Sequence, residues 1–165
     1  MAQRSGDAGI AAFAQSIELA LVQAYTDIAA TGTVTTAPAI EATASFAAHH
    51  GEHATALSAA AGDSAANRAN RRLVNEIRRQ IQRAADERAL LDIALTLENQ
   101  TASTYLFVLS ALEATQTLQL PASILPVESR HAVVLATLLE KDPKATFPTF
   151  LTQDQALKPD EFPVS

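Results

Sequence analysis

Two stretches of the chain decide its fold, IELALVQAY at residues 17–25 and LENQTASTY at residues 97–105. Each stretch has a glutamate in second place and a tyrosine in last place, 25 − 18 = 7 and 105 − 98 = 7 residues apart. Seven residues are about two turns of an α-helix, so the glutamate and the tyrosine lie on one helix face. The chain has 2 tyrosines, and both stand at this offset. The repeated pattern therefore predicts two related helices.

A histidine follows each stretch at a comparable distance. Glu18 and His53 are 53 − 18 = 35 residues apart, and Glu98 and His131 are 131 − 98 = 33 residues apart. Each histidine falls in the next helical segment of the chain. The two halves therefore look like a duplicated helix pair.

Each histidine also has a partner three residues earlier, which places both side chains on the same helix face. In the second half the pattern is Glu128-Ser129-Arg130-His131, and in the first half it is His50-Gly51-Glu52-His53. Four inward stripes of polar residues are predicted: Glu18, then His50 with His53, then Glu98, then Glu128 with His131.

Helix-forming residues, chiefly Ala, Leu, Gln, Glu and Arg, dominate the chain and predict an all-α fold. The apolar periodicity predicts a first helix over residues 9–30, closed by Gly32. A second helix is predicted from Pro38 to residue 61, closed by Gly62. Residues 63–70 are polar and predict a loop.

From residue 71 to residue 112 the pattern stays helical for about 40 residues, which predicts a break near residues 84–86. A short basic helix and a long third helix should result. Pro121 marks the entry to a fourth helix that stops before Pro143. We expect an antiparallel four-helix bundle over residues 1–142, with a long connection between helices 2 and 3. Residues 143–165 predict an extended, proline-rich C-terminal tail that packs on the bundle or trails from it.

The predicted inward glutamates stand on apolar stripes, which makes their charge costly. Glu18, for example, falls between Ala14 and Leu21 at helical spacing. Burying an ionised carboxylate without a partner costs several kcal/mol or forces it to take up a proton. Three such groups would repel one another, whereas one or two divalent cations between them would turn the net electrostatic interaction from repulsive to attractive. Carboxylates mixed with imidazoles suit iron, manganese or zinc, so we expect a metal site.

These residues resemble the ferritin-like superfamily, in particular its small bacterial and rubrerythrin-related members. The pattern of that family is a Glu on each of two helices and Glu-x-x-His on each of the other two. The resemblance covers residues 11–139. It implies metal ligands at Glu18, Glu98, Glu128, His53 and His131, with Glu128 as a bridge. It also implies one or two iron ions and oxidase, ferroxidase or peroxide-reducing chemistry, with dioxygen or peroxide as the reactant.

His50 departs from the family pattern, which commonly has a bridging carboxylate at that position. A neutral imidazole cannot bridge in the same way or supply the negative charge, so we keep His50 as a candidate ligand of an asymmetric, mixed or singly occupied site. A shifted register is the competing interpretation, with His49 and Glu52 turned inward. That register would turn His53 away, although His53 has a counterpart in His131.

The two tyrosines are expected next to the ligands. Tyr25 and Tyr105 can each donate a hydrogen bond from the phenol to a carboxylate across the core. The alternative role is electron transfer through a tyrosyl radical. We favour the structural role for both residues.

Composition excludes several classes of function. A net charge of -6 and a pI near 5.1 disfavour nucleic acid as a partner. The absence of cysteine excludes thiolate metal sites, including the iron-thiolate domain of rubrerythrins. No stretch reaches the roughly 20 apolar residues of a membrane span. We expect a soluble protein, cytoplasmic or exported if a leader peptide was removed, and a monomer or homodimer.

Three functions fit this sequence. The first is a two-metal oxidoreductase, the second a protein that binds or sequesters a metal without turnover, and the third a metal-free structural bundle. The sequence alone does not separate them. What His50 does to the metal pair is the question that the structure has to address.

Overall fold

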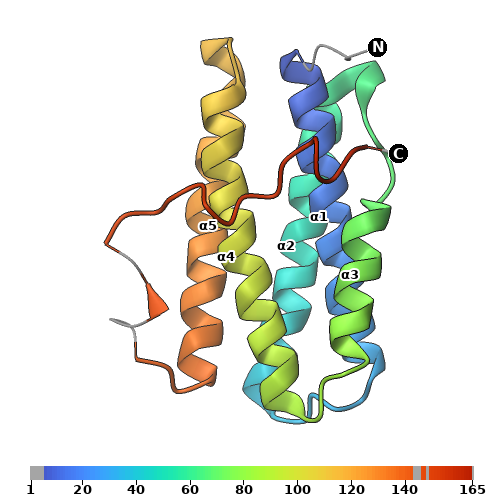
Figure 1. Cartoon of the computed structure of the whole chain (residues 1–165), viewed down its shortest axis with the longest axis vertical. Coiled ribbons are helices and arrows are strands. Elements are labelled where there is room, and N and C mark those ends of the chain that lie inside the picture. Colours follow the sequence, from blue (N-terminus) through green and yellow to red (C-terminus); the bar gives the residue numbers. More distant parts are fainter. Residues whose placement is uncertain (1–5, 143–145, 148, 165) are drawn as a thin grey trace.

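The computed structural model describes residues 6–142, 146–147 and 149–164. The fold consists of helices that lie side by side along one long axis (Figure 1). They are α1 (Asp7–Ala30), α2 (Ala37–Ala61), α3 (Arg71–Ile81), α4 (Glu87–Ala111) and α5 (Gln119–Leu138), with short 3₁₀ turns η1 (Gly62–Ser64) and η2 (Thr115–Thr117). Within the described ranges there is no β-strand. The all-α prediction is therefore confirmed.

The helix boundaries follow the sequence signals closely. α1 and α2 end where the predictions placed their ends, and the chain turns at Gly32 and Gly62 with φ values of 66° and 55°. The long helical pattern after residue 71 breaks into α3 and α4 with a linker over residues 82–86, as predicted. The antiparallel course, the long connection and the boundary at residue 142 stay predictions. None of the described helices is long and apolar enough to cross a membrane.

The helices pack as two pairs. α1 packs most extensively on α2, and α4 packs most extensively on α5, while the short α3 covers α1. One large apolar cluster runs through the interior and includes Ile17, Leu21 and Ile28 of α1 and Leu90 of α4. Burial of such side chains supplies the main favourable free energy of the fold. The helix pairs match the two halves of the sequence, so the duplicated pattern corresponds to a spatial arrangement.

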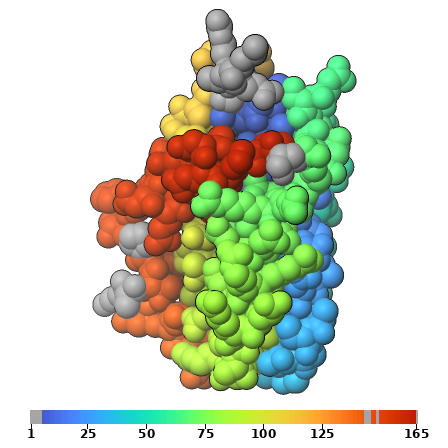
Figure 2. Space-filling view, turned by 45° about the vertical axis from the view of Figure 1, so that its right-hand side comes forward, coloured from blue at the N-terminus to red at the C-terminus, as the bar shows by residue number. Residues whose placement is uncertain are grey.

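The C-terminal segment crosses α4 and ends beside the start of α3 (Figures 1 and 2). The backbone N–H of Leu157 donates to Thr104 Oγ1 at 2.9 Å. The ring of Phe162 is buried, and the guanidinium of Arg72 lies 5.2 Å from its centroid. Phe150, in contrast, is 80% exposed. Docking of the tail therefore relies on some of its apolar side chains and leaves others in solvent.

Asn70 joins the start of α3 to this tail. Its Oδ1 accepts a hydrogen bond from the backbone N–H of Leu73 at 3.2 Å and so caps α3. Its Nδ2 donates to the carbonyl of Phe162 at 3.0 Å. Asn70 is buried, so these polar atoms have little access to water as a substitute. The side chain therefore links two segments that are far apart in the sequence.

We expect Asn70→Ala to lower the free energy of unfolding by about 2 kcal/mol, because the cap is lost and a buried carbonyl loses its donor. Urea denaturation measures this change, and limited proteolysis reports release of the tail. Asn70→Ser is the matched control, since it keeps a capping oxygen and is too short to reach the carbonyl of Phe162. It should fall between the wild type and the alanine variant. Equal stability of all three proteins would contradict this role.

Glu87 joins the α1–α2 connection to the first turn of α4. Its Oε1 accepts from the Thr36 hydroxyl at 2.6 Å, and its Oε2 accepts from the backbone N–H of Thr36 at 3.0 Å and from that of Thr35. These hydrogen bonds, that of the Thr36 hydroxyl first, lower the pKa of Glu87 from 4.5 to about 2. The ionised carboxylate therefore stabilises the folded state.

The lowered pKa fixes the pH range of this stabilisation. It is fully present above pH 4.5 and is lost as the pH falls through about 2. We expect Glu87→Gln to be less stable than the wild type by about 1 kcal/mol at pH 7, a value kept small because the carboxylate is exposed. The difference should shrink steadily below pH 4.5 in urea titrations. A difference that stays constant down to the acid limit of the fold would refute this assignment.

Candidate metal centre

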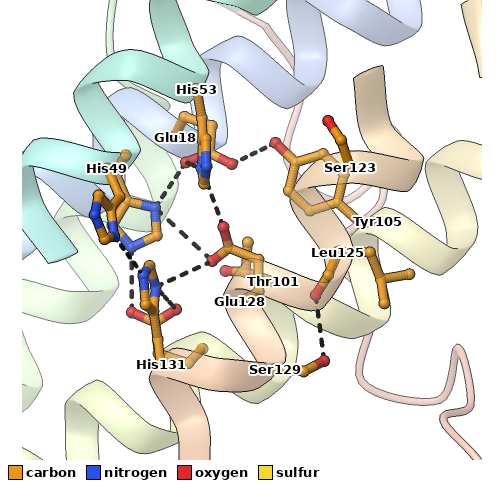
Figure 3. Close-up of polar contacts among 12 residues, drawn as sticks. Glu18, His49, His53, Thr101, Tyr105, Ser123, Leu125, Glu128, Ser129 and His131 are labelled. Atoms are coloured by element: carbon orange, nitrogen blue, oxygen red, sulfur yellow. Dashed lines mark hydrogen bonds and ion pairs between the residues drawn. The ribbon is translucent and has the colours of Figure 1, made fainter. Parts of the chain in front are cut away.

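Six ionisable side chains from four helices meet in the core. Five of them are no more than 3% exposed, and His53 is 14% exposed. Figure 3 shows Glu18, His53, Glu128 and His131 pointing toward one another from α1, α2 and α5. The set consists of Glu18 from α1, His50 and His53 from α2, Glu98 from α4, and Glu128 and His131 from α5. These are the residues that the sequence predicted on inward stripes.

The register of α2 decides which histidines face the core. His50 is fully buried and His53 is half-buried, whereas His49 and Glu52 are exposed. The structure therefore has the register with His50 and His53 inward. The shifted register, with His49 and Glu52 as the inward pair, is not the one found, because the apolar stripe of α2 that contains Phe46 and Leu57 continues through the positions of His50 and His53.

His50 lies between two carboxylates. Its Nδ1 is 2.7 Å from Glu18 Oε2, and its Nε2 is 3.1 Å from Glu98 Oε1. The ring of Tyr25 stacks on the imidazole with 5.6 Å between the centroids. One imidazole thus connects a ligand candidate of the first half to a ligand candidate of the second half.

His131 occupies the corresponding place in the second half. Its Nδ1 is 3.2 Å from Glu98 Oε2 and 3.9 Å from Glu128 Oε2. The ring of Phe46 stacks on one face of the imidazole, with 4.0 Å between centroids and 26° between planes. The ring is thereby held with Nδ1 toward the cluster.

The two tyrosines cross over between the halves. Tyr25 of α1 donates its phenol hydrogen to Glu98 of α4, and Tyr105 of α4 donates to Glu18 of α1. Both phenols are buried. Burial, followed by the nearby carboxylate charges, raises both tyrosine pKa values well above 10, so each phenol remains a donor. The role beside metal ligands that the sequence suggested for both residues stays a prediction.

The carboxylate oxygens of Glu128 and one ring nitrogen of His53 lack hydrogen bonds. His53 Nδ1 lies 3.1 Å from Glu128 Oε1, within ion-pair distance, but the two groups are not aligned for a hydrogen bond. All three atoms are buried and have no hydrogen-bond partner in the structure. Buried polar atoms without partners are rare in folded proteins. A cation between them would satisfy all three atoms, so the residues present fit a metal ion.

The electrostatics of the cluster separate its carboxylates into two kinds. Burial disfavours the ionised form of Glu18 and Glu98, but their contacts with the neighbouring histidines outweigh burial and lower both pKa values. Burial, assisted by the charge of Glu18, raises the pKa of Glu128 well above 4.5. Glu128 is thus the carboxylate whose charge the neighbouring histidines compensate least.

The pKa values of His50 and His53 are both shifted upwards. Burial opposes protonation of His50, but Glu98 and Glu18 raise its pKa well above 6.5. His53 follows the same logic: its contacts with Glu128 and Glu18 overcome burial and raise its pKa to about 9. Without a metal, protonated histidines therefore supply the positive charge that the carboxylates require.

Two overlapping groups of four residues have their ligand atoms within 4.8 Å of one another. The first group contains Glu18 and His53, the second contains Glu98 and His131, and both contain His50 and Glu128. The shared residues lie where the two halves meet. The arrangement can hold one cation in either group, or two neighbouring cations.

Sequence reasoning missed the position of one histidine relative to the cluster. The sequence offers His49 as a ligand only in the shifted register, yet its Nδ1 lies 2.9 Å from His131 Nε2. Burial, followed by the Coulombic effect of the nearby His131, lowers the pKa of His49. No spacing rule links these residues, because they lie on different helices. The doublet His49-His50 was the one available signal.

Comparison with known proteins identifies one family. The ferritin-like domain matches residues 6–141, which is most of the 165-residue chain and includes all six side chains of the cluster. Neither the curated proteins nor the solved structures contain a significant match.

A pair of matched substitutions tests the difference between the two kinds of carboxylate. Without metal, Glu128→Leu should leave the protein as stable as the wild type or stabilise it by about 1 to 3 kcal/mol, because it removes two unpaired buried oxygens. Glu98→Leu should destabilise by about 3 kcal/mol, because it leaves donors on Tyr25, His50 and His131 unpaired.

Both free energies of unfolding are to be measured by urea denaturation in the presence of a chelator. The two glutamates are equally buried, so side-chain volume and burial are matched in this comparison. Equal destabilisation by the two substitutions would show that Glu128 is satisfied in the metal-free protein, against the geometry described above.

Proposed function

The chain belongs to the ferritin-like domain family. We therefore propose that its buried cluster holds one or two metal ions, with iron as the preferred metal. The observation that carries this proposal is the pair of overlapping ligand groups together with the unpaired atoms of Glu128 and His53. Carboxylates and imidazoles in this proportion also accommodate manganese or zinc. An antiparallel four-helix bundle, monomeric or dimeric, is the arrangement proposed around the site.

Each side chain has a proposed role at the metal. Glu18 and Glu98 would be terminal ligands, one for each half of the site. Glu128 is the shared ligand, because each group of the cluster includes it and its two oxygens are free of hydrogen bonds. His53 and His131 are the imidazole ligands, each paired with the glutamate of its own half. His50 joins as a shared ligand or stays as a positive charge between the halves.

We further propose redox chemistry of the oxidase, ferroxidase or peroxide-reducing type. A bound iron ion would supply one-electron chemistry toward dioxygen or peroxide. The protein contributes a core in which the ligands are almost completely shielded from water, and phenol donors that orient the carboxylates Glu18 and Glu98. His53 is the most exposed of the six ligands, so a small reactant would approach from its side.

One observation favours a different function, a bundle that works without metal. His50 forms close contacts with Glu18 and Glu98 through its two ring nitrogens, and these carboxylates overcome burial and raise its pKa well above 6.5. A protonated His50 can therefore replace a metal ion as their counter-charge. The third candidate function is a protein that binds a metal ion without turnover.

Metal content and optical spectra separate the three functions. Protein purified without chelator is analysed for metals, then loaded with ferrous iron and exposed to dioxygen or peroxide. We expect about one to two equivalents of metal and a spectral change on oxidation. Glu18→Ala and His131→Ala should lose the metal, whereas Glu52→Gln, which alters an exposed carboxylate of α2, should retain it.

The other outcomes are equally informative. Metal that binds stoichiometrically but gives no spectral change with either oxidant would exclude the redox centre and favour sequestration. Absence of bound metal under every loading condition, with a melting temperature that no metal raises, would exclude both metal functions. A metal at 100 times its dissociation constant should stabilise the fold by about 2.7 kcal/mol, which a melting experiment detects readily.

A further inference from the structure

His49 reaches the metal centre from the surface of the protein. Its Nδ1 lies 2.9 Å from His131 Nε2, and the two rings are nearly parallel, with 11° between their planes and 5.2 Å between their centroids. His49 is exposed, whereas His131 is 3% exposed. Figure 3 shows the two histidines approaching one another from α2 and α5. The pair therefore connects the solvent side of α2 to a ligand candidate in the core.

Two contacts constrain which nitrogen of His131 carries a hydrogen. A neutral imidazole has one N–H donor and one acceptor nitrogen. Without a metal, Nδ1 donates to the carboxylate of Glu98 at 3.2 Å, so Nε2 is the acceptor nitrogen and His49 Nδ1 is the donor. A cation bound at Nδ1 would move the hydrogen of the neutral ring to Nε2. His49 Nδ1, 2.9 Å away, is placed to accept a hydrogen bond from Nε2 in that state.

We propose that His49 is a positioning residue of the metal centre, which accepts a hydrogen bond from His131 Nε2 and thereby presents His131 Nδ1 to the metal. This inference rests on the proposed function, because it assigns His131 as a ligand. Ligand histidines usually donate their second N–H to a carboxylate, a backbone carbonyl or water. Here a second imidazole, from a neighbouring helix, takes that place.

The hydrogen bond and the packing of His131 can be separated. Phe46 covers one face of the His131 ring whatever residue stands at position 49. His49→Phe keeps an aromatic ring of similar size and removes the acceptor nitrogen. His49→Asn keeps an acceptor at the position of Nδ1 and loses the ring. If His49 acts through packing, His49→Phe should keep the zinc affinity of the wild type. If it acts through the hydrogen bond, His49→Asn should keep that affinity instead.

The first measurement is zinc affinity of the full-length protein by competition with a chromophoric chelator. Loss of a partner to a ligand histidine typically lowers metal affinity 10- to 100-fold, so we expect a loss in this range for His49→Phe. His49→Asn should recover most of the affinity. Ser45→Ala, another exposed position on α2, is the matched control and should bind as the wild type does. Full affinity of the His49→Phe variant would overturn the proposal.

The second measurement reads the hydrogen on His131 Nε2 in the zinc-loaded protein, by ¹H–¹⁵N correlation of the histidine rings. In the wild type and in His49→Asn this hydrogen should exchange slowly with solvent, and in His49→Phe it should exchange faster because its acceptor is lost. Equal exchange in His49→Phe and the wild type would overturn the proposal as well. If the wild type binds no zinc, the proposed function fails, and the claim that His49 presents a ligand fails with it. Zinc binding by the wild type with an unaltered affinity in His49→Phe contradicts the claim about His49 alone.

Discussion

The constraint on which this structure depends is the burial of three carboxylates in the core of a small helical bundle. Glu18, Glu98 and Glu128 are each no more than 1% exposed. Burial of one ionised carboxylate without a partner costs several kcal/mol, comparable to the whole stability of a domain of this size. The fold can tolerate three buried carboxylates only if it brings hydrogen-bond donors or positive charges to them. The placement of the histidines and tyrosines follows from this requirement.

The tyrosines meet part of the requirement and also hold the two halves together. Because Tyr25 donates to a glutamate on α4 and Tyr105 donates to a glutamate on α1, each hydrogen bond crosses between the helix pairs. A sliding motion of one pair along the other would break both bonds at once. The same contacts therefore satisfy buried acceptors and fix the register in which the ligand stripes face one another.

Much of this arrangement could be predicted from the sequence, because a helix converts a local offset, such as that of Glu18 to Tyr25, into a shared face. The break between α3 and α4 was predictable too, since the helical pattern was too long for one helix. What the sequence did not reveal depends on contacts between helices. Spacing cannot tell that His49 reaches His131, because the two residues are 82 positions apart and their contact depends on how α2 and α5 are rotated. Nor could it show that the oxygens of Glu128 lack hydrogen bonds, since tertiary packing sets their orientation.

The departure from the family pattern at His50 determines how a metal would bind. Because His50 contacts Glu18 and Glu98, two of the three carboxylates already have a counter-charge when no metal is present. A metal ion that binds these carboxylates must displace that contact and the proton that the raised pKa of His50 retains. Metal binding at this centre therefore competes with an internal ion pair, which lowers the net affinity relative to a site with four carboxylates. The same ion pair supplies a counter-charge without a metal, so we expect the bundle to fold metal-free and to gain or lose an ion without unfolding.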